Sequence, residues 1–427
     1  MTDQTSDKLT IITELLDLPD IRVIDLKIDH RNDEVTIKVE STKEIIPRRE
    51  CNKPTVRHGY GRTLRLRHLP ILGKTTMIEI TSRRGICHDC HGGTTTNERL
   101  DWCALNSNQT KPYEQHLLFE LVNSTIADVS QREGVDCHTI HALVDRNVET
   151  KVNFSSIECL GILGLDEISL KKGHNDFVTI ISYRANEKVH VLGVIKGREK
   201  AEILEFLGSI PSRLKKTIRV ACCDLYEGYM NACKEAFEGK VPVVADRFHV
   251  RRLYRKSLIQ LRKSELKRLK KTLSEDQYKQ LKPAIALLMR HNDYFEEDEK
   301  AIVAPLFSLS PKLKESYAMS RKLSGIFDSK IMPEAAKEKI AAWILLVEDS
   351  GLDCFNNFIK SLSKHMTEIC NYFIAGDSSG FVEGFNNKVK VLKRRCYGLS
   401  NVTRLFQRLL IDTVGFSRFS QRAILAC

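Results

Sequence analysis

The clearest periodic pattern of the chain lies between Ser378 and Ser400. Apolar side chains recur there at steps of three and four residues, which places them on one face of an α-helix: Val382, Phe385, Val389, Leu392 and Cys396. The neighbouring face is polar and becomes basic along its length: Glu383, Asn386, Asn387, Lys390 and Arg394. The pattern predicts a helix that packs on a core, and it leaves open whether the charged face is merely solvated or functional.

Alternation of apolar and polar residues predicts strands in the first part of the chain. The segments 21–29 and 34–40 alternate in this way on either side of Asn32 and Asp33, which favour a turn. They predict a β-hairpin behind a short helical run from Leu9 to Leu16. We therefore expect a small N-terminal α/β segment over residues 1–50.

Helical spacing returns between Lys111 and Val148, with an interruption at Gly134. Two helices joined by a short glycine turn are typical of a helix-turn-helix, whose second helix enters the major groove of DNA. The pattern predicts such a DNA-binding domain over residues 109–150, although similar patterns also arise in other helical proteins. The expected DNA contacts point outward from the second helix, CHTIHALVDR: His138, Thr139, His141 and Arg146.

From Cys159 onward the chain changes to apolar, β-branched runs. Three of these runs, separated by short polar breaks, predict an antiparallel meander. Alternating helices and strands follow, with IRVACCDLY and VPVVADRFHV as the fourth and fifth strands. The order βββαβαβα predicts a mixed sheet with helices on its faces, the arrangement of a ribonuclease H-like domain.

Residues 251–370 are rich in lysine and arginine, carry helical runs and show no strand signal. Because this region is too long for a loop, it predicts an all-helical insertion. The flanking ranges 158–250 and 371–427 then form one ribonuclease H-like catalytic domain. With 427 residues, 42% of them hydrophobic, the chain can fill several cores, and we expect a multidomain α/β protein.

The formal net charge of +12 is concentrated in residues 251–282 and 388–422. A localised basic excess favours a nucleic-acid partner over a membrane. No apolar run of about 18 residues and no secretory signal pattern is visible in the sequence. We therefore expect a cytoplasmic protein whose 13 cysteines are mostly reduced thiols or metal ligands.

One C-x2-C pair, Cys87 and Cys90, has the spacing at which two thiolates hold one tetrahedral zinc ion. Cys51 is a third candidate ligand, but no second C-x2-C pair surrounds it. The fourth ligand is left open among three residues: His58, His91 and Cys103. We expect a zinc-ribbon-like unit over residues 51–105, and the sequence leaves open whether it binds Zn²⁺ or has lost its metal.

Acidic residues recur at one edge of the predicted catalytic sheet. Asp166 lies on its first strand and Asp224 at the end of its fourth, and these strands are neighbours in the predicted arrangement. Asp246 ends the fifth strand, and His249 follows three residues later. Asp224 could instead cap a turn, and Asp246 could cap the helix that begins at Phe248.

Four motifs, in this order, resemble the ISL3 family of bacterial insertion-sequence transposases: GLDEISLKKGHN, CCDLYEGY, ADRFHV and SSGFVEGFNNKVKVLKRRCYG. The resemblance extends over nearly the whole chain. It implies that the Asp-Asp-Glu catalytic triad of this family falls on Asp166, Asp224 and Glu383. The chain departs from the family in its ribbon, where the family usually has two C-x2-C pairs.

The implied reaction cleaves and joins DNA strands at a phosphodiester, which two Mg²⁺ (or Mn²⁺) ions can assist. Such hard cations prefer carboxylate oxygens, so Asp166, Asp224 and Glu383 are the expected metal ligands. Residues after Glu383 on the same helix are expected to hold DNA phosphates: Asn386, Asn387, Lys390, Lys393, Arg394 and Arg395.

The resemblance implies a nucleoid-associated transposase that binds terminal inverted repeats and joins them to target DNA. Because two ends must be brought together, at least a homodimer is expected. One alternative is a catalytically inactive DNA-binding repressor of the same family, and another is a structure-specific ribonuclease H-like nuclease. The intact acidic triad favours the transposase over the repressor, and the separate DNA-reading module favours it over the nuclease.

Overall fold

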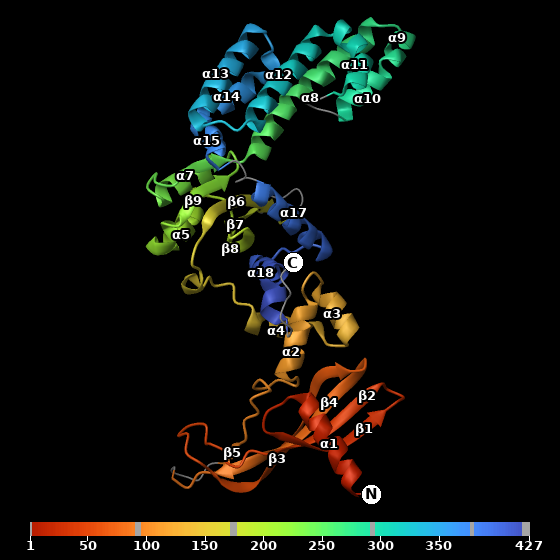
Figure 1. The fold of residues 1–427 in the computed structure, drawn as a ribbon, viewed down its shortest axis with the longest axis vertical. Coiled ribbons are helices and arrows are strands. Elements are labelled where there is room, and N and C mark those ends of the chain that lie inside the picture. The colour runs from red at the N-terminus through yellow and green to blue at the C-terminus, as the bar shows by residue number, and fades with distance from the viewer. Residues whose placement is uncertain (1, 90–94, 171–176, 291–294, 376–379, 421–427) are drawn as a thin grey trace. The chain divides into compact units, whose positions relative to one another are not determined.

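The computed structural model describes residues 2–89, 95–170, 177–290, 295–375 and 380–420 (Figure 1). The chain divides into two compact units: Met1–Val148 with Val414–Cys427, and Glu149–Thr413. No helix among the described residues combines the length and the hydropathy needed to cross a membrane.

The first unit begins with a sheet and one helix. Helix α1 (Thr2–Leu16) precedes the strands β1 (Ile21–Asp29), β2 (Glu34–Ser41), β3 (Val56–Ile71), β4 (Lys74–Ile86) and β5 (Thr95–Asn97). The predicted hairpin is confirmed, because β1 and β2 pair antiparallel. The sheet order is β1-β2-β4-β3, with β5 paired to β4. The segments 1–50 and 51–105, predicted as separate units, therefore share one sheet.

One hydrophobic core joins these two segments. The parallel pairing of β2 with β4 brings Ile37 opposite Ile78, and both side chains are fully buried. Leu66 of β3 and Trp102 belong to the same cluster. Strands β3 and β4 thus share one hydrophobic core with the N-terminal hairpin.

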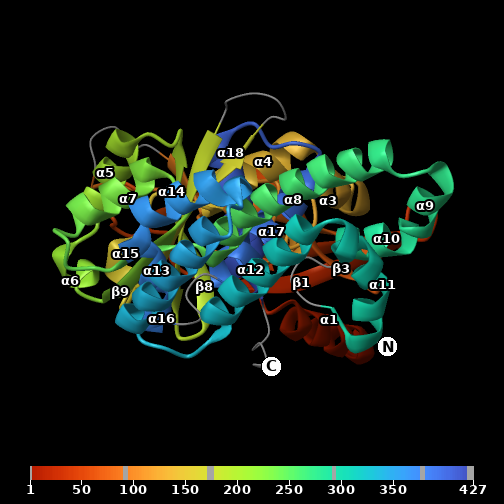
Figure 2. The same ribbon diagram turned by 90° about the horizontal axis from the view of Figure 1, so that it is seen from above.

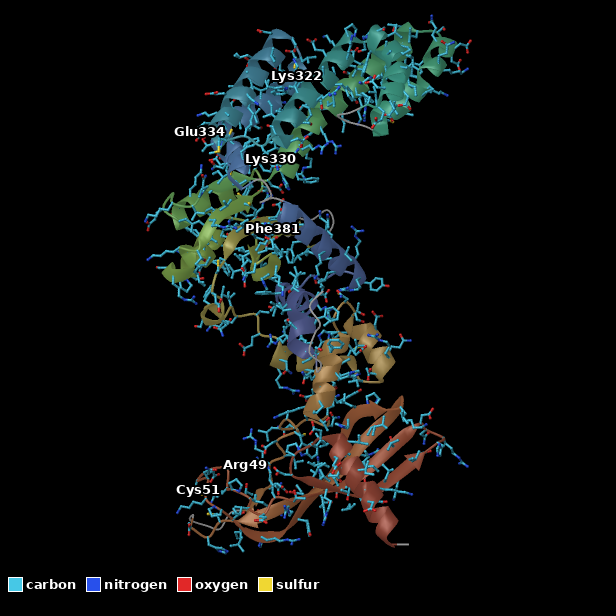
Figure 3. The ribbon with its side chains drawn as sticks, viewed as in Figure 1. Arg49, Cys51, Lys322, Lys330, Glu334 and Phe381 are labelled. Atoms are coloured by element: carbon cyan, nitrogen blue, oxygen red, sulfur yellow. The ribbon has the colours of Figure 1, made fainter. Side chains whose placement is uncertain are left out.

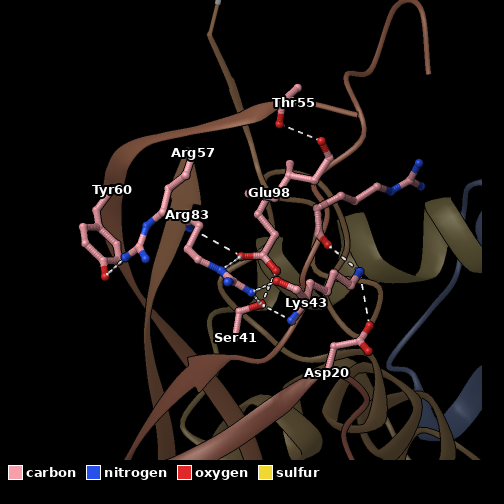
Figure 4. A network of polar contacts seen from close by, with 10 residues as sticks. Asp20, Ser41, Lys43, Thr55, Arg57, Tyr60, Arg83 and Glu98 are labelled. Atoms are coloured by element: carbon pink, nitrogen blue, oxygen red, sulfur yellow. Dashed lines mark hydrogen bonds and ion pairs between the residues drawn. The ribbon is translucent and has the colours of Figure 1, made fainter. Parts of the chain in front are cut away.

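A polar network ties the far end of this sheet together (Figure 4). The carboxylate of Glu98 is buried and accepts a hydrogen bond from the Arg83 backbone amide at 3.3 Å. The Arg83 guanidinium also donates to Ser41 Oγ at 2.9 Å. Lys43 Nζ lies 2.7 Å from Asp101 and 3.3 Å from Asp20. Residues after β5 are thereby held against β2 and β4.

Three helices complete the described first unit, together with the end of the last helix: α2 (Lys111–Glu120), α3 (Ile126–Glu133) and α4 (Cys137–Asn147). Gly134 ends α3 in the left-handed conformation, with a φ of 63°, which glycine adopts without steric cost. The carboxylate of Asp136 then caps α4 by accepting from the His138 amide at 2.8 Å. The glycine turn and the helix after it lie where the sequence predicted them, whereas the first predicted helix is divided into α2 and α3.

The second unit contains a five-stranded mixed sheet: β6 (Gly161–Ser169), β7 (Phe177–Ala185), β8 (Lys188–Lys196), β9 (Ile218–Cys223) and β10 (Val243–Ala245). Its order is β10-β9-β6-β7-β8. Strands β6, β7 and β8 form the predicted antiparallel meander, whereas β9 pairs parallel with both β6 and β10.

Helices cover both faces of this sheet. Helices α5 (Lys200–Ser209) and α7 (Glu227–Ala236) pack one face, and the short α6 (Ser212–Lys215) lies between them in the chain. Helices α17 (Gly380–Arg395) and α18 (Val402–Phe419) bury apolar side chains against the other face. The predicted order βββαβαβα is confirmed, with α6 as an added helical turn.

The chain between β10 and α17, where the sequence predicts a helical insertion, forms a series of helices. Its helices are α8 (Arg247–Thr272), α9 (Glu275–Gln280), α10 (Lys282–Arg290), α11 (Glu297–Leu309), α12 (Pro311–Asp328), α13 (Pro333–Asp349), α14 (Asn356–Lys364), α15 (Met366–Cys370) and α16 (Tyr372–Ala375). Short 3₁₀ turns stand at Phe154–Ser156 and Asp353–Phe355. Figure 2 shows α12 beside α8 and α13. Trp343 of α13 is buried in their hydrophobic core, and its indole donates to Met319 O of α12 at 2.8 Å.

Candidate active site

Two aspartates lie at the same edge of the second sheet. Strands β6 and β9 are parallel neighbours in which Gly164 is opposite Cys222. Asp166 and Asp224 each follow two residues later, so continuing this register brings them to the same level of the sheet. The predicted adjacency of these two strands is therefore confirmed.

Asp246 joins this edge from the next strand. Ala245 of β10 is opposite Cys223 of β9, and Asp246 follows directly. Its side chain caps α8, because Asp246 Oδ1 accepts from the Phe248 amide at 2.9 Å. The cap that the sequence left open is thus observed. Asp246 is also buried, and its charge raises the pKa of Asp166.

Backbone amides and one side chain orient the two facing carboxylates. Asp166 Oδ1 accepts from the Glu167 amide at 2.7 Å, and Oδ2 accepts from Asn386 Nδ2 of α17. Asp224 Oδ1 accepts from the Tyr226 amide at 3.0 Å, which is the turn cap considered above. Among the described residues, no lysine or arginine forms an ion pair with Asp166 or Asp224.

Burial is the largest cause that raises the pKa of both carboxyls. It raises the pKa of Asp166 to about 6, with the charge of Asp246 acting in the same direction. The pKa of Asp224 also rises to about 6, from burial first and then from the charge of Asp166. Buried acids whose pKa values are raised by burial and by neighbouring carboxylates are typical of functional sites.

His249 faces this pair without neutralising it. Its Nδ1 lies 4.0 Å from Asp224 Oδ2. Burial, Arg252 and Lys390 lower the pKa of His249 to about 4, so the imidazole is neutral at neutral pH. The contact is therefore not an ion pair, and His249 does not neutralise the negative charge of the aspartates.

Close packing fixes the start of α17 over β6. A Cβ atom at Gly164 would lie 2.8 Å from Val382 Cγ2 and 3.1 Å from Phe381 Cζ, so only glycine lets the helix approach this closely. Phe381 marks this part of α17 in Figure 3, and the Arg184 guanidinium lies 5.7 Å from its ring. Gly164 was not among the residues predicted from the sequence, although a glycine inside an apolar strand can indicate a close approach.

Glu383 follows these packed residues on the backbone of α17, but its side chain lies outside the described residues. Position 383 precedes Asn386 by three residues, so both positions share one face of the helix. Asn386 reaches Asp166 from that face. The structure thus brings the backbone of position 383 to the side of α17 that serves the aspartate edge.

A groove of about 500 Å³ continues from this edge between the end of β6 and the second half of α17. Lys390, Lys393 and Arg394 line it opposite Glu167. Lys390 and Arg394 are exposed, as is the neighbouring Asn387, whereas Lys393 Nζ donates to Ser169 O. Most of the predicted phosphate-binding residues therefore border one basic groove or lie beside it.

Besides Lys393, two of the predicted phosphate-binding residues have partners inside the protein. Asn386 is buried and bonded to Asp166. Arg395 pairs with the buried Asp412 of α18, which Arg408 also contacts at 3.0 Å. The contact of Arg395 with DNA stays a prediction, and its observed contact holds α17 to α18.

The predicted recognition helix presents only part of its expected surface. His138 is exposed, while Thr139 and His141 are half-buried. Arg146 Nη2 lies 2.7 Å from the buried Glu114 of α2, although about half of its side chain (47%) remains exposed. Their contacts with DNA stay predictions.

In the ribbon, Cys51 (labelled in Figure 3) lies beside Cys87, with 3.9 Å between their sulfur atoms and no disulfide. Two thiolates about 2.3 Å from one tetrahedral zinc ion would be roughly 3.8 Å apart, so the spacing fits a shared metal. Cys90 and His91 lie outside the described residues. Cys103 donates to backbone carbonyls instead, and among described residues no group of three such ligands assembles.

Comparison with known proteins supports the family resemblance. The family described as "Transposase" (DDE_Tnp_ISL3) matches residues 163–409, which span the strands, insertion and α17 of the candidate site. The family described as "zinc-finger of transposase IS204/IS1001/IS1096/IS1165" matches residues 50–90.

Individual relatives match over most of their length. The transposase for insertion sequence element IS1001 of Bordetella parapertussis is 24% identical over 371 residues, 87% of each chain. The transposase for insertion sequence element IS1557 of Mycobacterium tuberculosis is 19% identical over 345 residues, 76% of each chain.

Proposed function

Because the chain belongs to the ISL3 family of transposases, we propose that it is an active DDE transposase that binds the terminal inverted repeats of an insertion sequence and catalyses metal-dependent strand cleavage and transfer. The observation that carries this proposal is that Asp166 and Asp224 lie at one sheet edge. Helix α17 packs closely over that edge because Gly164 has no side chain. Glu383 on that helix supplies the third acid of the proposed triad.

The residues of this edge fit a divalent cation. Asp166 and Asp224 are buried carboxylates with raised pKa values, and the described residues offer them no cationic side chain as an ion-pair partner. We propose that these two residues and Glu383 hold Mg²⁺ or Mn²⁺, since hard cations prefer carboxylate oxygens. When bound, two such ions stabilise negative charge on the attacking and leaving oxygens of a phosphodiester.

The side chains of the protein itself position the reacting groups. Asn386 holds the Asp166 carboxylate in place through its amide. Lys390 and Arg394, exposed at the groove, would attract DNA phosphates and add salt-dependent affinity. His249, neutral beside Asp224, adds no competing positive charge at the acidic edge.

The strand order β10-β9-β6-β7-β8 and the parallel pairing of β9 with β6 support a ribonuclease H-like assignment for residues 158–250 and 371–427. The helices α8 to α15 support residues 251–370 as its insertion. We further propose that the helix-turn-helix over residues 109–150 and the ribbon read the transposon ends, and that Zn²⁺ bound by Cys51, Cys87 and Cys90 stiffens the ribbon.

Synapsis of two ends requires at least two copies of the chain, so we propose a homodimer or a larger assembly on DNA. Its place of action would be the bacterial nucleoid. The competing function is a catalytically inactive repressor of the same family, which would bind the repeats without cutting them. The oriented Asp166 and Asp224 favour the enzyme, because a repressor has no need for two buried acids whose ionised forms are disfavoured by burial.

The test is Glu383→Gln, which keeps the size of the side chain and removes its charge. We expect DNA binding in Ca²⁺ to survive and strand transfer in Mg²⁺ to fall by several orders of magnitude. Labelled repeat ends and a target plasmid provide the measurement.

The matched control for this test is Glu205→Gln on the exposed face of α5, which should leave strand transfer unchanged. Near-normal transfer by Glu383→Gln would remove Glu383 from the site. Binding of repeats without any transfer by the wild-type protein would favour the repressor, and cleavage without joining would favour a nuclease.

A further inference from the structure

The C-terminal end of α17 contains a tyrosine where helices usually have glycine. Gly398 N donates to Lys393 O at 3.1 Å and Tyr397 N donates to Arg394 O at 3.1 Å. These two bonds form a Schellman motif, in which the residue at the position of Tyr397 takes a left-handed conformation. Tyr397 does so, with a φ of 50°. A bulky residue is disfavoured in this conformation, because its Cβ crowds the backbone.

Contacts within the protein do not offset this strain. Tyr397 is 97% exposed, so its ring makes almost no contact that would stabilise the fold. Glycine at this position would end the helix with less strain. A strained and exposed residue motivates the hypothesis of a contact made outside the folded chain, and at Tyr397 the surroundings give that hypothesis its content.

The surroundings of Tyr397 indicate what that contact is. Tyr397 lines the groove of about 500 Å³ together with Lys390 and Arg394, and Glu167 lies on the same groove next to Asp166. The Glu167 carboxylate is already paired with Arg198 Nη1 at 3.0 Å, so the groove remains basic. Ile168 and Leu170 are buried, which leaves the tyrosine ring as its exposed apolar surface.

An aromatic ring beside exposed cations is the combination that binds unpaired nucleotides. The cations attract the phosphates, and the ring stacks on a base of any identity. Bases inside a duplex are already stacked on each other and cannot present a face to the ring. The chemistry of this groove therefore suits an unpaired nucleotide better than a paired one.

We propose that Tyr397 is a stacking platform for an unpaired base of the DNA strand held at the aspartate edge. This inference rests on the proposed function, because it assigns the groove to the DNA on which that function acts. The ring would fix the position of the strand beside Asp166, with Lys390 and Arg394 on its phosphates. Tyr397 would then be a binding residue of the same site.

The experiment compares two labelled DNAs in Ca²⁺: a blunt duplex, and the same duplex with a short single-stranded 3′ extension that contains 2-aminopurine. We expect the wild-type protein to prefer the extended DNA and to quench its 2-aminopurine fluorescence. Tyr397→Ala should lower the affinity for the extended DNA by roughly 5- to 150-fold, the equivalent of ~1–3 kcal/mol for one stacked base, and should abolish the quenching. Its affinity for blunt DNA should stay unchanged.

Three further variants separate stacking from structure. Tyr397→Trp should keep both the preference and the quenching. Tyr397→Gly should lose both while its thermal midpoint rises, because the strain at this position is relieved. Lys390→Ala should weaken binding of both DNAs and reduce the salt dependence, as a phosphate contact does.

A wild-type protein without preference for the extended DNA, or a Tyr397→Ala protein that keeps the preference, would overturn the proposal. A changed sedimentation of Tyr397→Ala with an unchanged DNA preference would assign the ring to a contact between copies instead. A strand-transfer assay on the same proteins shows whether the stacking proposal or the proposed transposase activity has failed. Wild-type protein that joins ends while Tyr397→Ala binds normally refutes the stacking alone, whereas tyrosine-dependent binding without any joining refutes the transposase activity alone.

Discussion

The two buried carboxylates destabilise the protein that contains them. The pKa values of Asp166 and Asp224, about 6, lie above the ordinary value of 3.8. Between pH ~4 and ~6 the folded protein therefore binds more protons than the unfolded chain, and the stability contributed by these groups falls as pH rises through that window. Above it, the full cost of two facing charges remains, and a bound cation would offset this cost.

This balance predicts a pH-dependent effect of Mg²⁺ on stability. Mg²⁺ should raise the thermal midpoint clearly at pH ~7.5 and only weakly at pH ~5, because protons compete with the metal for the carboxylates. Thermal unfolding with and without Mg²⁺ in the two buffers provides the measurement. The double variant Asp166→Asn, Asp224→Asn is the control, and an equal effect of Mg²⁺ on this variant would place the ion elsewhere.

At the scale of elements, the contact between α17 and β6 determines where the backbone of α17 lies relative to the sheet edge, and so whether the proposed third acid can reach it. Two segments more than 200 residues apart meet there, and the amide of Asn386 on α17 reaches Asp166 on β6. Gly164 permits this approach, since a methyl group at that position would contact Val382, Ser182 and Phe381. The geometry of the site thus depends on a residue that takes no part in the chemistry.

Gly164→Ala should consequently affect catalysis more than DNA binding. Overpacking of this kind typically costs ~1–3 kcal/mol, and the displaced α17 would carry Glu383 away from the aspartates. Denaturant unfolding and strand transfer measure the two effects. Gly208→Ala in α5 is the matched control, because its Cβ meets no atom within 4 Å, and it should stabilise the protein by ~0.5–1 kcal/mol. Unchanged transfer by Gly164→Ala would show that α17 does not need this close approach.

The ribbon is the second element whose state can be tested. If Cys51 and Cys87 share a zinc ion, purified protein should carry about one equivalent of zinc. Cys87→Ser should release it and lower the protease resistance of the first unit. Cys159→Ser, at an exposed cysteine of the second unit, should keep the metal. Folded, repeat-binding protein without zinc would leave the ribbon as a purely structural unit.

At the scale of the whole molecule, general affinity for DNA and recognition of sequence have different sources. The net charge of +12 supplies affinity for any DNA and falls with salt. Base contacts from α4 would supply specificity. Of the residues expected there, His138 is exposed, whereas Arg146 also neutralises the buried Glu114.

His138→Ala should therefore weaken binding to the terminal repeat by ~1–3 kcal/mol more than binding to random DNA. Arg146→Ala should weaken repeat binding as well, but it should also lower stability because Glu114 is left buried without its partner. Competition binding at several salt concentrations, together with thermal unfolding, separates these effects. Equal losses on repeat and random DNA would assign His138 to the phosphate backbone.

The sequence by itself determined which elements form and in what order. Apolar periodicity predicted the hairpin at residues 21–40, the meander from β6 to β8, the helical insertion and α17, because the spacing of apolar side chains along a helix or strand is a local property. The same order of elements led to the adjacency of the strands that carry Asp166 and Asp224, since connection rules restrict how such a sheet can be wound.

Only the tertiary structure decided which of the suggested side chains meet. The pairing of β2 with β4, the amide of Asn386 on Asp166, the pairing of Arg395 with Asp412 and the sulfur contact of Cys51 with Cys87 all join segments far apart in sequence, or neighbouring helices through their inner faces. A periodic pattern shows that a helix has a polar face. Which neighbour that face contacts depends on how closely the elements pack. At α17 the close packing on β6 is possible because Gly164 has no Cβ atom.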